Sequence, residues 1–414
     1  MVSAPAAEGW AAPLFPRSEY ERRWRRVREA AAARDLAGVV VFSRGGAQTD
    51  SYADVFYLAN HYTVFPLLPD AAPHWSGHSH CALIVPAAGE PVLVLDFDEL
   101  RPDLVPVDDV VVSGDVPAAV AGVLRDRGLE GEAVGLVGAN ALQVAPYLRL
   151  RELSPRTELV VCDGLVEDLR VVKTAAEQDR LRAATRVGEL VVAAMLEAAG
   201  RGGRTEADAV AEGYALAARH GVAMYDAAVS SGPNSGRYAY GRLPSWSLRE
   251  LEPGDLFHVD CYGALDGYLF DLSRTAIVAS RPSGDQRELL DGAIAAIGAG
   301  LEAVRPGASG AELFAVVRGE LDRRGLSGAA GEGEEAVGFS GYDCHGHGFG
   351  LAWEWPWITP WEERRVEAGM VIAVECMAGR PASGSVKLEQ AVLVGEDANE
   401  LLYELPPYHV DADA

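Results

Sequence analysis

The sequence predicts an N-terminal α/β domain followed by an α+β domain. Over the first 160 or so residues, short apolar runs typical of buried strands alternate with helical stretches, as in a layered α/β fold. From Ala175 the pattern changes to long amphipathic helices and to strands that pair as hairpins. A length of 414 residues fits two or three domains, and two is the simplest count. We therefore expect domains at residues 1–170 and 171–414.

The N-terminal domain begins with a predicted helix at residues 18–35, where Ser18 would be the N-cap. A second helix is expected at residues 116–128. The apolar runs predict strands at residues 36–43, 81–86, 90–96, 107–114 and 133–138. The domain should close near residues 159–174.

The C-terminal domain opens with two amphipathic helices. The first covers residues 175–199, and the second has Thr205 as its N-cap, with acidic residues in its first turn. Further helices are expected at residues 284–303 and 309–325. Strands are expected at residues 223–231, 255–262, 268–278, 347–353, 369–378 and 385–394.

The composition excludes several classes of protein. A formal net charge of −25 argues against a nucleic-acid partner, because such proteins need a basic face for phosphate. No run approaches the roughly 20 apolar residues of a membrane span, so no membrane partner is expected. The N-terminus has no charged start followed by an apolar core, and the five cysteines are scattered. A cytoplasmic location is the expectation.

One predicted hairpin carries two carboxylates, in "HVDCYGALDGYLFDLSRT" at residues 258–275. With a four-residue loop at 264–267, Asp260 lies opposite Asp271, with Cβ atoms about 5 Å apart. With a loop centred on Asp266 and Gly267, the register shifts by two residues. Side chains alternate with a period of two, so both carboxylates share one face in either register.

A second predicted hairpin, "VIAVECMAGRPASGSVKLEQAVLV", places Glu375 opposite Glu389. Carboxylates this close repel one another unless a proton or a cation compensates them, and divalent cations would do so. An imidazole ligand is available in "HGHGFGL", where glycines around His347 allow close approach. His345 is the alternative ligand, although the glycine context favours His347.

These segments resemble the creatinase/prolidase/aminopeptidase P family, whose catalytic domain has the pita-bread fold. The resemblance lies in "VDCYGALDGYLFDLSRT", "GHGFGL", "GMVIAVE" and "VKLEQAVLV", and it spans about residues 170–400. It implies two divalent ions (Mn, Fe, Co or Zn), of which Asp271 and Glu389 would each contact both. It also implies a homodimer. The implied ligands are Asp260, Asp271, His347, Glu375 and Glu389.

Two positions depart from the family pattern. Peptidases of this family carry a histidine shortly after "SGPN" and another seven residues after the metal histidine. Ala239 and Glu354 stand at these positions. An extra carboxylate at Glu354 would repel a substrate carboxylate and attract a cation. We therefore expect poor or no cleavage of ordinary Xaa-Pro dipeptides, and activity on a small substrate that carries positive charge or an unusual C–N or C–S bond.

The function implied by the resemblance is a dinuclear metal-dependent hydrolase of a small C–N substrate (an amide, a dipeptide or an amidine), similar to Xaa-Pro peptidases. Glu375 or Glu354 would transfer the proton to the leaving nitrogen. A lyase on the same scaffold, similar to dimethylsulfoniopropionate lyases, and a non-catalytic binding module are alternatives. The binding module is disfavoured, because a buried cluster of carboxylates without metals is costly.

Aromatic residues near the proposed ligands are candidates for substrate contact, although packing in the core would also explain them. They are Tyr238, Tyr240, Trp353 and Trp355. The segment 61–80 contains His74, His78 and His80, and we expect a loop there. In a dimer, this loop could supply the missing imidazole to the partner's site.

Overall fold

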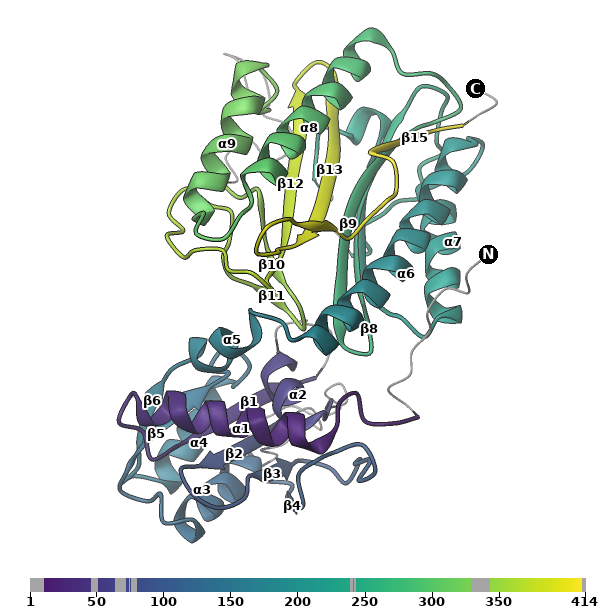
Figure 1. The fold of residues 1–414 in the computed structure, drawn as a ribbon. Coiled ribbons are helices and arrows are strands. Elements are labelled where there is room, and N and C mark those ends of the chain that lie inside the picture. The colour runs from purple at the N-terminus through teal and green to yellow at the C-terminus, as the bar shows by residue number, and fades with distance from the viewer. Residues whose placement is uncertain are drawn as a thin grey trace. The chain divides into compact units, whose positions relative to one another are not determined.

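The structure is a computed structural model that describes residues 11–45, 51–63, 72–73, 75, 80–238, 241, 243–328 and 343–411. The chain divides into two compact units, at Glu8–Arg170 and at Val171–Ala414 (Figure 1). Each unit is described by itself. Over the described residues, no helix is both long enough and apolar enough to cross a membrane.

The N-terminal unit is a mixed sheet with helices on both faces. Its elements in chain order are α1 (Arg17–Ala32), β1 (Gly38–Arg44), α2 (Ala53–Ala59), β2 (His80–Pro86), β3 (Val92–Leu95), β4 (Asp109–Val112), α3 (Val116–Asp126), β5 (Ala133–Val137), α4 (Val144–Leu153), β6 (Glu158–Val161) and α5 (Gly164–Arg170). The strand order is β4-β3-β2-β1-β5-β6, and β2 is antiparallel to both β1 and β3. The predicted α/β class is confirmed.

The alternation of side chains along β1 explains the two helical layers. Val40 and Phe42 belong to one core cluster with Val120 and Leu124 of α3. The intervening residues of β1 face the other way, toward α1 and α2, which contact this strand. Both faces of the strand are therefore apolar, as the uninterrupted apolar run predicts.

The first helix begins one residue earlier than the sequence predicts. Pro16 is extended and occupies the N-cap position, and the Glu19 amide donates a hydrogen bond to the Pro16 carbonyl. Ser18 therefore lies inside the first turn, and the prediction that it is the N-cap is wrong. A proline fits just before a helix because it has no N–H that would need a partner.

The C-terminal unit consists of two antiparallel-rich sheets and four long helices. Its elements are α6 (Ala175–Gly200), α7 (Glu206–Arg219), β7 (Ala223–Ser231), a 3₁₀ helix η1 (Gly232–Asn234), β8 (Leu256–Leu265), β9 (Tyr268–Ile277), α8 (Gly284–Ala303), α9 (Gly310–Arg323), β10 (Gly346–Phe349), β11 (Trp353–Glu354), β12 (Val371–Arg380), β13 (Gly384–Leu393), β14 (Glu400–Leu401) and β15 (Tyr408–Val410). The single strand expected at 347–353 is instead two short antiparallel strands, β10 and β11.

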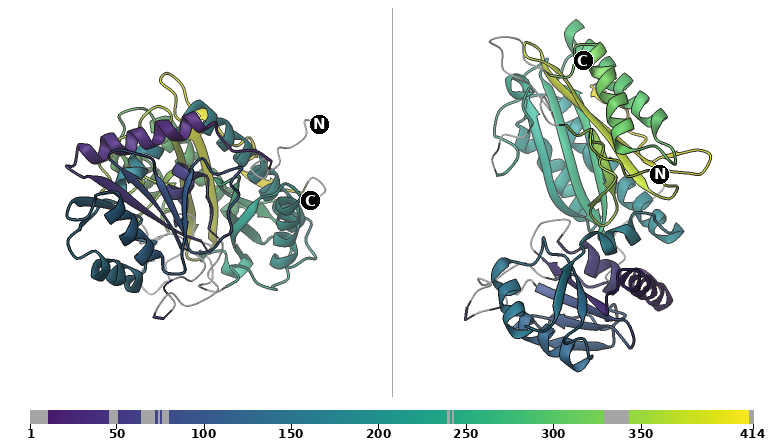
Figure 2. Two further views of the ribbon diagram at one scale, coloured as in Figure 1. Left: turned by 90° about the horizontal axis from the view of Figure 1, so that it is seen from below. Right: turned by 90° about the vertical axis from the view of Figure 1, so that its left-hand side faces the viewer.

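The two sheets of this unit meet along β13, which contacts both β8 and β9. One sheet has the order β11-β10-β12-β13-β14 and the other the order β15-β9-β8-β7. Helix α6 covers the outside of β8 and β9, and α7 packs against α6 and β7 (Figures 1 and 2). Helix α8 covers the outside of β12 and β13, with α9 packed against it. The inner faces of the hairpins are left to face one another.

Strand alternation decides which residues reach these inner faces. Val374 and Cys376 of β12 lie in the apolar core shared with α8 and α9, so Glu375 between them points inward. On the other sheet, an added Cβ at Gly188 of α6 would lie 2.3 Å from the Phe270 ring. Phe270 therefore faces the helix, and its neighbour Asp271 faces the interior.

Candidate metal centre

The hairpin of β8 and β9 adopts the second of the two predicted registers. Leu265 pairs with Tyr268, which leaves a two-residue turn. Asp266 and Gly267 form this turn with φ values of 51° and 82°, as a type I′ turn requires. Asp260 is therefore opposite Ser273 and not Asp271, so the prediction of a four-residue loop is wrong. The shift is two residues, and the two carboxylates still share a face.

The hairpin of β12 and β13 has the predicted register, with Glu375 directly opposite Glu389. Arg380 pairs with Gly384 across a three-residue loop centred on Ala382. Gly384 has a φ of 76°, a conformation that favours glycine. The prediction for this pair is confirmed.

His347 reaches the carboxylates from β10, which pairs with β12. Its neighbour Gly346 has a φ of 132°, and a Cβ there would lie 2.0 Å from the Ala373 carbonyl oxygen. Glycine is thus needed for β10 to pair this closely with β12. His345, the alternative ligand, stacks on Phe314 at 5.1 Å and does not belong to the cluster described next.

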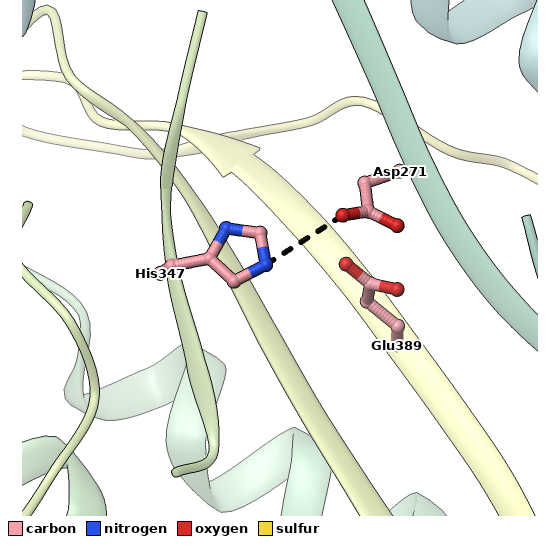
Figure 3. Close-up of side chains that lie close together, drawn as sticks. All are labelled: Asp271, His347 and Glu389. Atoms are coloured by element: carbon pink, nitrogen blue, oxygen red, sulfur yellow. Dashed lines mark ion pairs between the residues drawn. The ribbon is translucent and has the colours of Figure 1, made fainter. Parts of the chain in front are cut away.

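Asp271, His347 and Glu389 point toward one another between the sheets (Figure 3). All three are buried, and each offers a ligand atom within 4.8 Å of the others. His347 Nε2 lies 3.6 Å from Asp271 Oδ2, while His347 Nδ1 lies 3.1 Å from the Gly348 carbonyl oxygen. Nδ1 therefore carries the proton, and the lone pair of Nε2 faces Asp271.

These atoms fit a bound cation. Glu389 Oε1 is buried and has no hydrogen-bond partner, which costs free energy unless a positive charge is present. Oxygen atoms with one imidazole are typical ligands of divalent transition metals. The Trp353 indole N–H donates to Asp271 Oδ2 at 2.7 Å and orients this carboxylate, as outer partners of metal ligands do.

Asp260 and Glu375, the other two predicted ligands, are held by Lys387. Its Nζ lies 2.8 Å from Asp260 Oδ2 and 2.6 Å from Glu375 Oε2. We did not predict this lysine as a site residue. The signal was available, because Lys387 is two residues before Glu389 on the same strand and must face the same side.

Burial and neighbouring charge set the pKa values of these groups. Burial, and then the charge of Asp260, raise the pKa of Asp271 well above 3.8. Burial, and then Asp271, raise the pKa of Glu389 well above 4.5. Burial opposes ionisation of Asp260 too, but Lys387 beside it holds its pKa below 3.8. Without metal, the lysine thus keeps Asp260 ionised.

Comparison of the sequence with models of protein families identifies the family of this chain. A model of the creatinase/prolidase N-terminal domain matches residues 23–172. A model of metallopeptidase family M24 matches residues 179–396, which is more than half of the chain. The chain belongs to metallopeptidase family M24. The predicted resemblance and fold are confirmed, and the family implies divalent metal ions.

Several relatives are similar over most of the chain. An Xaa-Pro dipeptidase from Pyrococcus furiosus is 29% identical over 278 residues, which are 66% of this chain and 73% of the relative. A probable dipeptidase PepE from Mycobacterium tuberculosis is 29% identical over 413 residues, covering 92% of this chain and 94% of the relative. The solved dipeptidase PepE from Mycobacterium ulcerans matches with a TM-score of 0.75 at 27% identity, covering 96% of this chain and 98% of that one.

Two further buried groups, neither of them predicted, hold the predicted ligands Asp271 and Glu389 through the backbone. The Tyr403 hydroxyl accepts from the Asp271 amide at 3.0 Å and donates to the Asp271 carbonyl at 2.7 Å. The Arg274 guanidinium donates to the carbonyls of Glu389 and Pro406. Both residues tie the ligand strands to the segment before β15, which holds β9 and β13 in place.

Glu354 does not present a free negative charge in this M24 protein. It is 1% exposed, and its Oε2 lies 2.5 Å from Lys173 Nζ. Lys173 is also buried and donates to the Val171 carbonyl at 2.9 Å. The expected repulsion of a substrate carboxylate by Glu354 is therefore wrong, because an adjacent ammonium neutralises it.

The aromatic candidates lie in different surroundings. The Tyr238 hydroxyl donates to Asp260 Oδ2 at 2.7 Å, and the Trp353 indole N–H donates to Asp271, so both contact predicted ligands. Trp355 packs against the apolar core of β12 and β13, and the Arg364 guanidinium lies 4.8 Å from its ring centre. Ala239 and Tyr240 lie outside the described residues. A role of any of them in substrate binding stays a prediction.

The histidines of segment 61–80 are partly placed. His80 is the first residue of β2 and is 1% exposed, so it does not lie in a loop as expected. Its amide donates to Asp96 Oδ2 at 2.8 Å, which orders the start of the strand. His74 and His78 lie outside the described residues.

Proposed function

We propose that this chain is a divalent-metal-dependent dipeptidase that acts on Xaa-Pro and similar dipeptide-like amides. The observation that carries the proposal is the buried cluster of Asp271, His347 and Glu389, in which one carboxylate oxygen has no partner. Its support is membership of metallopeptidase family M24 and the names of relatives such as the Pyrococcus furiosus Xaa-Pro dipeptidase.

The proposal includes two ions per chain, drawn from Mn, Fe, Co and Zn. The cluster would hold one of them, and Asp260 and Glu375 would complete the set for the second. When bound, such ions polarise a carbonyl oxygen and lower the pKa of a bound water to near neutrality.

We assign proton transfer to Glu375 and not to Glu354. Glu375 lies on the inner face opposite Glu389, and its amide is held by the His345 carbonyl. Both glutamates bind a lysine, Glu375 through Lys387 and Glu354 through Lys173. Glu375 is preferred because it belongs to the predicted ligand set, whereas Glu354 is 1% exposed and does not belong to it.

The pair of Lys173 and Glu354 carries no net charge, so it permits a substrate with a free carboxylate. The reason given above for poor cleavage of Xaa-Pro dipeptides is thereby removed, and the proposal replaces that expectation.

We further propose that the enzyme is cytoplasmic and a homodimer. The absence of membrane-spanning helices in the described residues is consistent with the first point. The second rests on the family resemblance and on the histidine-bearing segment before β2, which would meet the partner's site.

Hydrolysis of a dipeptide panel by metal-stripped and metal-reconstituted protein tests the proposal. The panel should contain Xaa-Pro dipeptides and matched dipeptides without proline. Activity should depend on added Mn²⁺, Co²⁺ or Zn²⁺, and Asp271→Asn should lower it by at least about 100-fold, because a shared ligand is lost. Asp266→Asn is the matched control, since Asp266 lies in the turn of the same hairpin.

Two results would contradict the proposal. One is a hydrolysis rate that is the same with and without metal. The other is an Asp271→Asn variant that keeps full metal content and full activity.

A further inference from the structure

We propose that the Lys387 ammonium is a built-in cation that occupies the Asp260 and Glu375 side of the metal centre and competes with the second divalent ion. The first ion then binds at Asp271, His347 and Glu389, and the second binds only when Lys387 withdraws. This inference rests on the proposed function and names a residue that controls the metal content of the same site.

The contacts of Lys387 use its full donor capacity. An ammonium has three N–H donors. Its Nζ lies 2.6 Å from Glu375 Oε2, 2.8 Å from Asp260 Oδ2 and 2.9 Å from Ser273 Oγ. The lysine is 0% exposed, so water does not compete for these donors. A buried lysine with three such partners is a structural component of the site.

The two sides of the centre differ in the partners available to their carboxylates. Both oxygens of Asp260 are engaged, because Oδ1 lies 2.6 Å from the Ser273 hydroxyl and Oδ2 receives Lys387 and Tyr238. Glu389 Oε1, in contrast, has no partner. An ion can therefore bind Glu389 Oε1 without displacing a hydrogen-bond donor. An ion that binds Asp260 must displace one.

Charge favours the same order of binding. Asp260, Asp271, Glu375 and Glu389 carry up to four negative charges, and Lys387 offsets one of them before any metal binds. One divalent ion brings the total offset to three. A second ion must approach the ammonium of Lys387 in a buried site, where repulsion between like charges is little screened.

Lysine also has the mobility that the mechanism requires. Its compact ammonium sits on a flexible four-carbon stem, unlike the planar guanidinium of arginine. The Tyr238 ring centre lies 5.5 Å from Nζ, which is within the range of a cation–π contact. The ammonium can therefore leave Asp260 and keep a favourable neighbour.

Titration of metal-free protein with Mn²⁺, followed by calorimetry and by electron paramagnetic resonance, tests the proposal without using activity. The wild-type chain should bind one ion tightly and a second on the order of 100-fold more weakly. Lys387→Gln should tighten the second ion by at least about tenfold and change the first by less than about threefold. Lys387→Arg, which keeps the charge, should keep the gap.

Lys173→Gln is the matched control. It removes a second buried ammonium that is paired with a glutamate, but Glu354 does not belong to the ligand set. Both affinities for Mn²⁺ should stay within about threefold of wild type. A change as large as that of Lys387→Gln would mean that loss of any buried charge alters the site, and the proposal would be wrong.

Anomalous diffraction from wild-type crystals keeps the proposal testable if Lys387→Gln does not fold. At one equivalent of Mn²⁺ a single peak should lie among Asp271, His347 and Glu389. With excess Mn²⁺ a second peak should appear beside Asp260, with Nζ displaced. A second peak with Lys387 still bonded to both Asp260 and Glu375 would overturn the proposal.

The outcomes separate the two proposals. Two wild-type ions of equal affinity, or an unchanged second affinity in Lys387→Gln, defeat the inference about Lys387 and leave the metallohydrolase intact. Absence of any tightly bound ion, together with metal-independent hydrolysis, defeats the proposed function itself.

Discussion

Lys173 and Glu354 form an ion pair between residues far apart in the sequence. Their side chains are 3% and 1% exposed. A buried pair of this kind contributes little net stability, but loss of one partner leaves an uncompensated charge in the interior. Glu354, at the position where peptidases of the family carry a histidine, therefore compensates the buried charge of Lys173.

We predict that Lys173→Met lowers the free energy of unfolding by about 3–5 kcal/mol. The double variant Lys173→Met/Glu354→Leu should recover most of this loss, because the stranded carboxylate is removed as well. Urea denaturation of the wild type and the two variants checks the prediction. A single variant within about 1 kcal/mol of wild type would contradict it.

His61, which follows α2 in the N-terminal unit, gives a prediction for acid pH. Burial lowers the pKa of His61 from 6.5 to about 4. The folded unit therefore binds a proton less readily than the unfolded chain, and stability is lost as pH falls below 6.5. This residue should cost the N-terminal unit about 2 kcal/mol at pH 5.

Calorimetry of wild type and His61→Leu at pH 7 and pH 5 measures this cost. The unfolding transition of the N-terminal unit should fall less between the two pH values in the variant. Identical pH dependence in the two proteins would show that His61 does not titrate in this way.

At the scale of elements, the pairing of β10 with β12 places His347, the predicted metal ligand. Gly346→Ala would bring a Cβ against the Ala373 carbonyl, and the φ of 132° at this position disfavours any side chain. We predict that the variant loses metal affinity by at least about tenfold, because β10 must move and carry His347 away from Asp271.

Metal affinity of Gly346→Ala and of Gly298→Ala, measured by titration of the stripped proteins, checks this prediction. Gly298 lies in α8, and a Cβ there would meet nothing within 4 Å. The control should bind metal as wild type does. Unchanged affinity in Gly346→Ala would mean that β10 does not need glycine at this position.

At the scale of the whole molecule, the proposed homodimer is measurable. Light scattering at micromolar concentration should give twice the 44.0 kDa mass of the chain. If the segment before β2 reaches the partner's site, His74→Ala/His78→Ala should lower activity and leave the mass unchanged. A monomer would contradict the dimer, and full activity of the double variant would contradict the role of the segment.

Long elements with strong local signals could be predicted from the sequence. The helix predicted at residues 284–303 and the strand predicted at residues 223–231 have the observed bounds. Thr205 is the predicted N-cap of α7 and accepts from the Asp208 amide. Short elements such as α2 and β14 were missed, because seven or fewer residues carry too little periodicity to be distinguished from loops.

The sequence by itself determined which face each carboxylate would occupy. Strand side chains alternate through covalent geometry alone, so Asp260 shares a face with Asp271, and Glu375 lies opposite Glu389, before any tertiary contact is known. The register of the first hairpin was left open between two choices, and the two-residue turn at Asp266 and Gly267 selected one of them.

Only the tertiary structure decided how those charges are compensated. Lys387 and Lys173 look alike in the sequence, yet one lies between two predicted metal ligands and the other neutralises Glu354. Strand alternation could place Lys387 on the face of Glu375, but Asp260 and Glu354 lie on other elements, far along the chain from the lysines that bind them. Their pairing depends on how the two sheets of the C-terminal unit meet, because burial there leaves each charge only the neighbours that packing supplies.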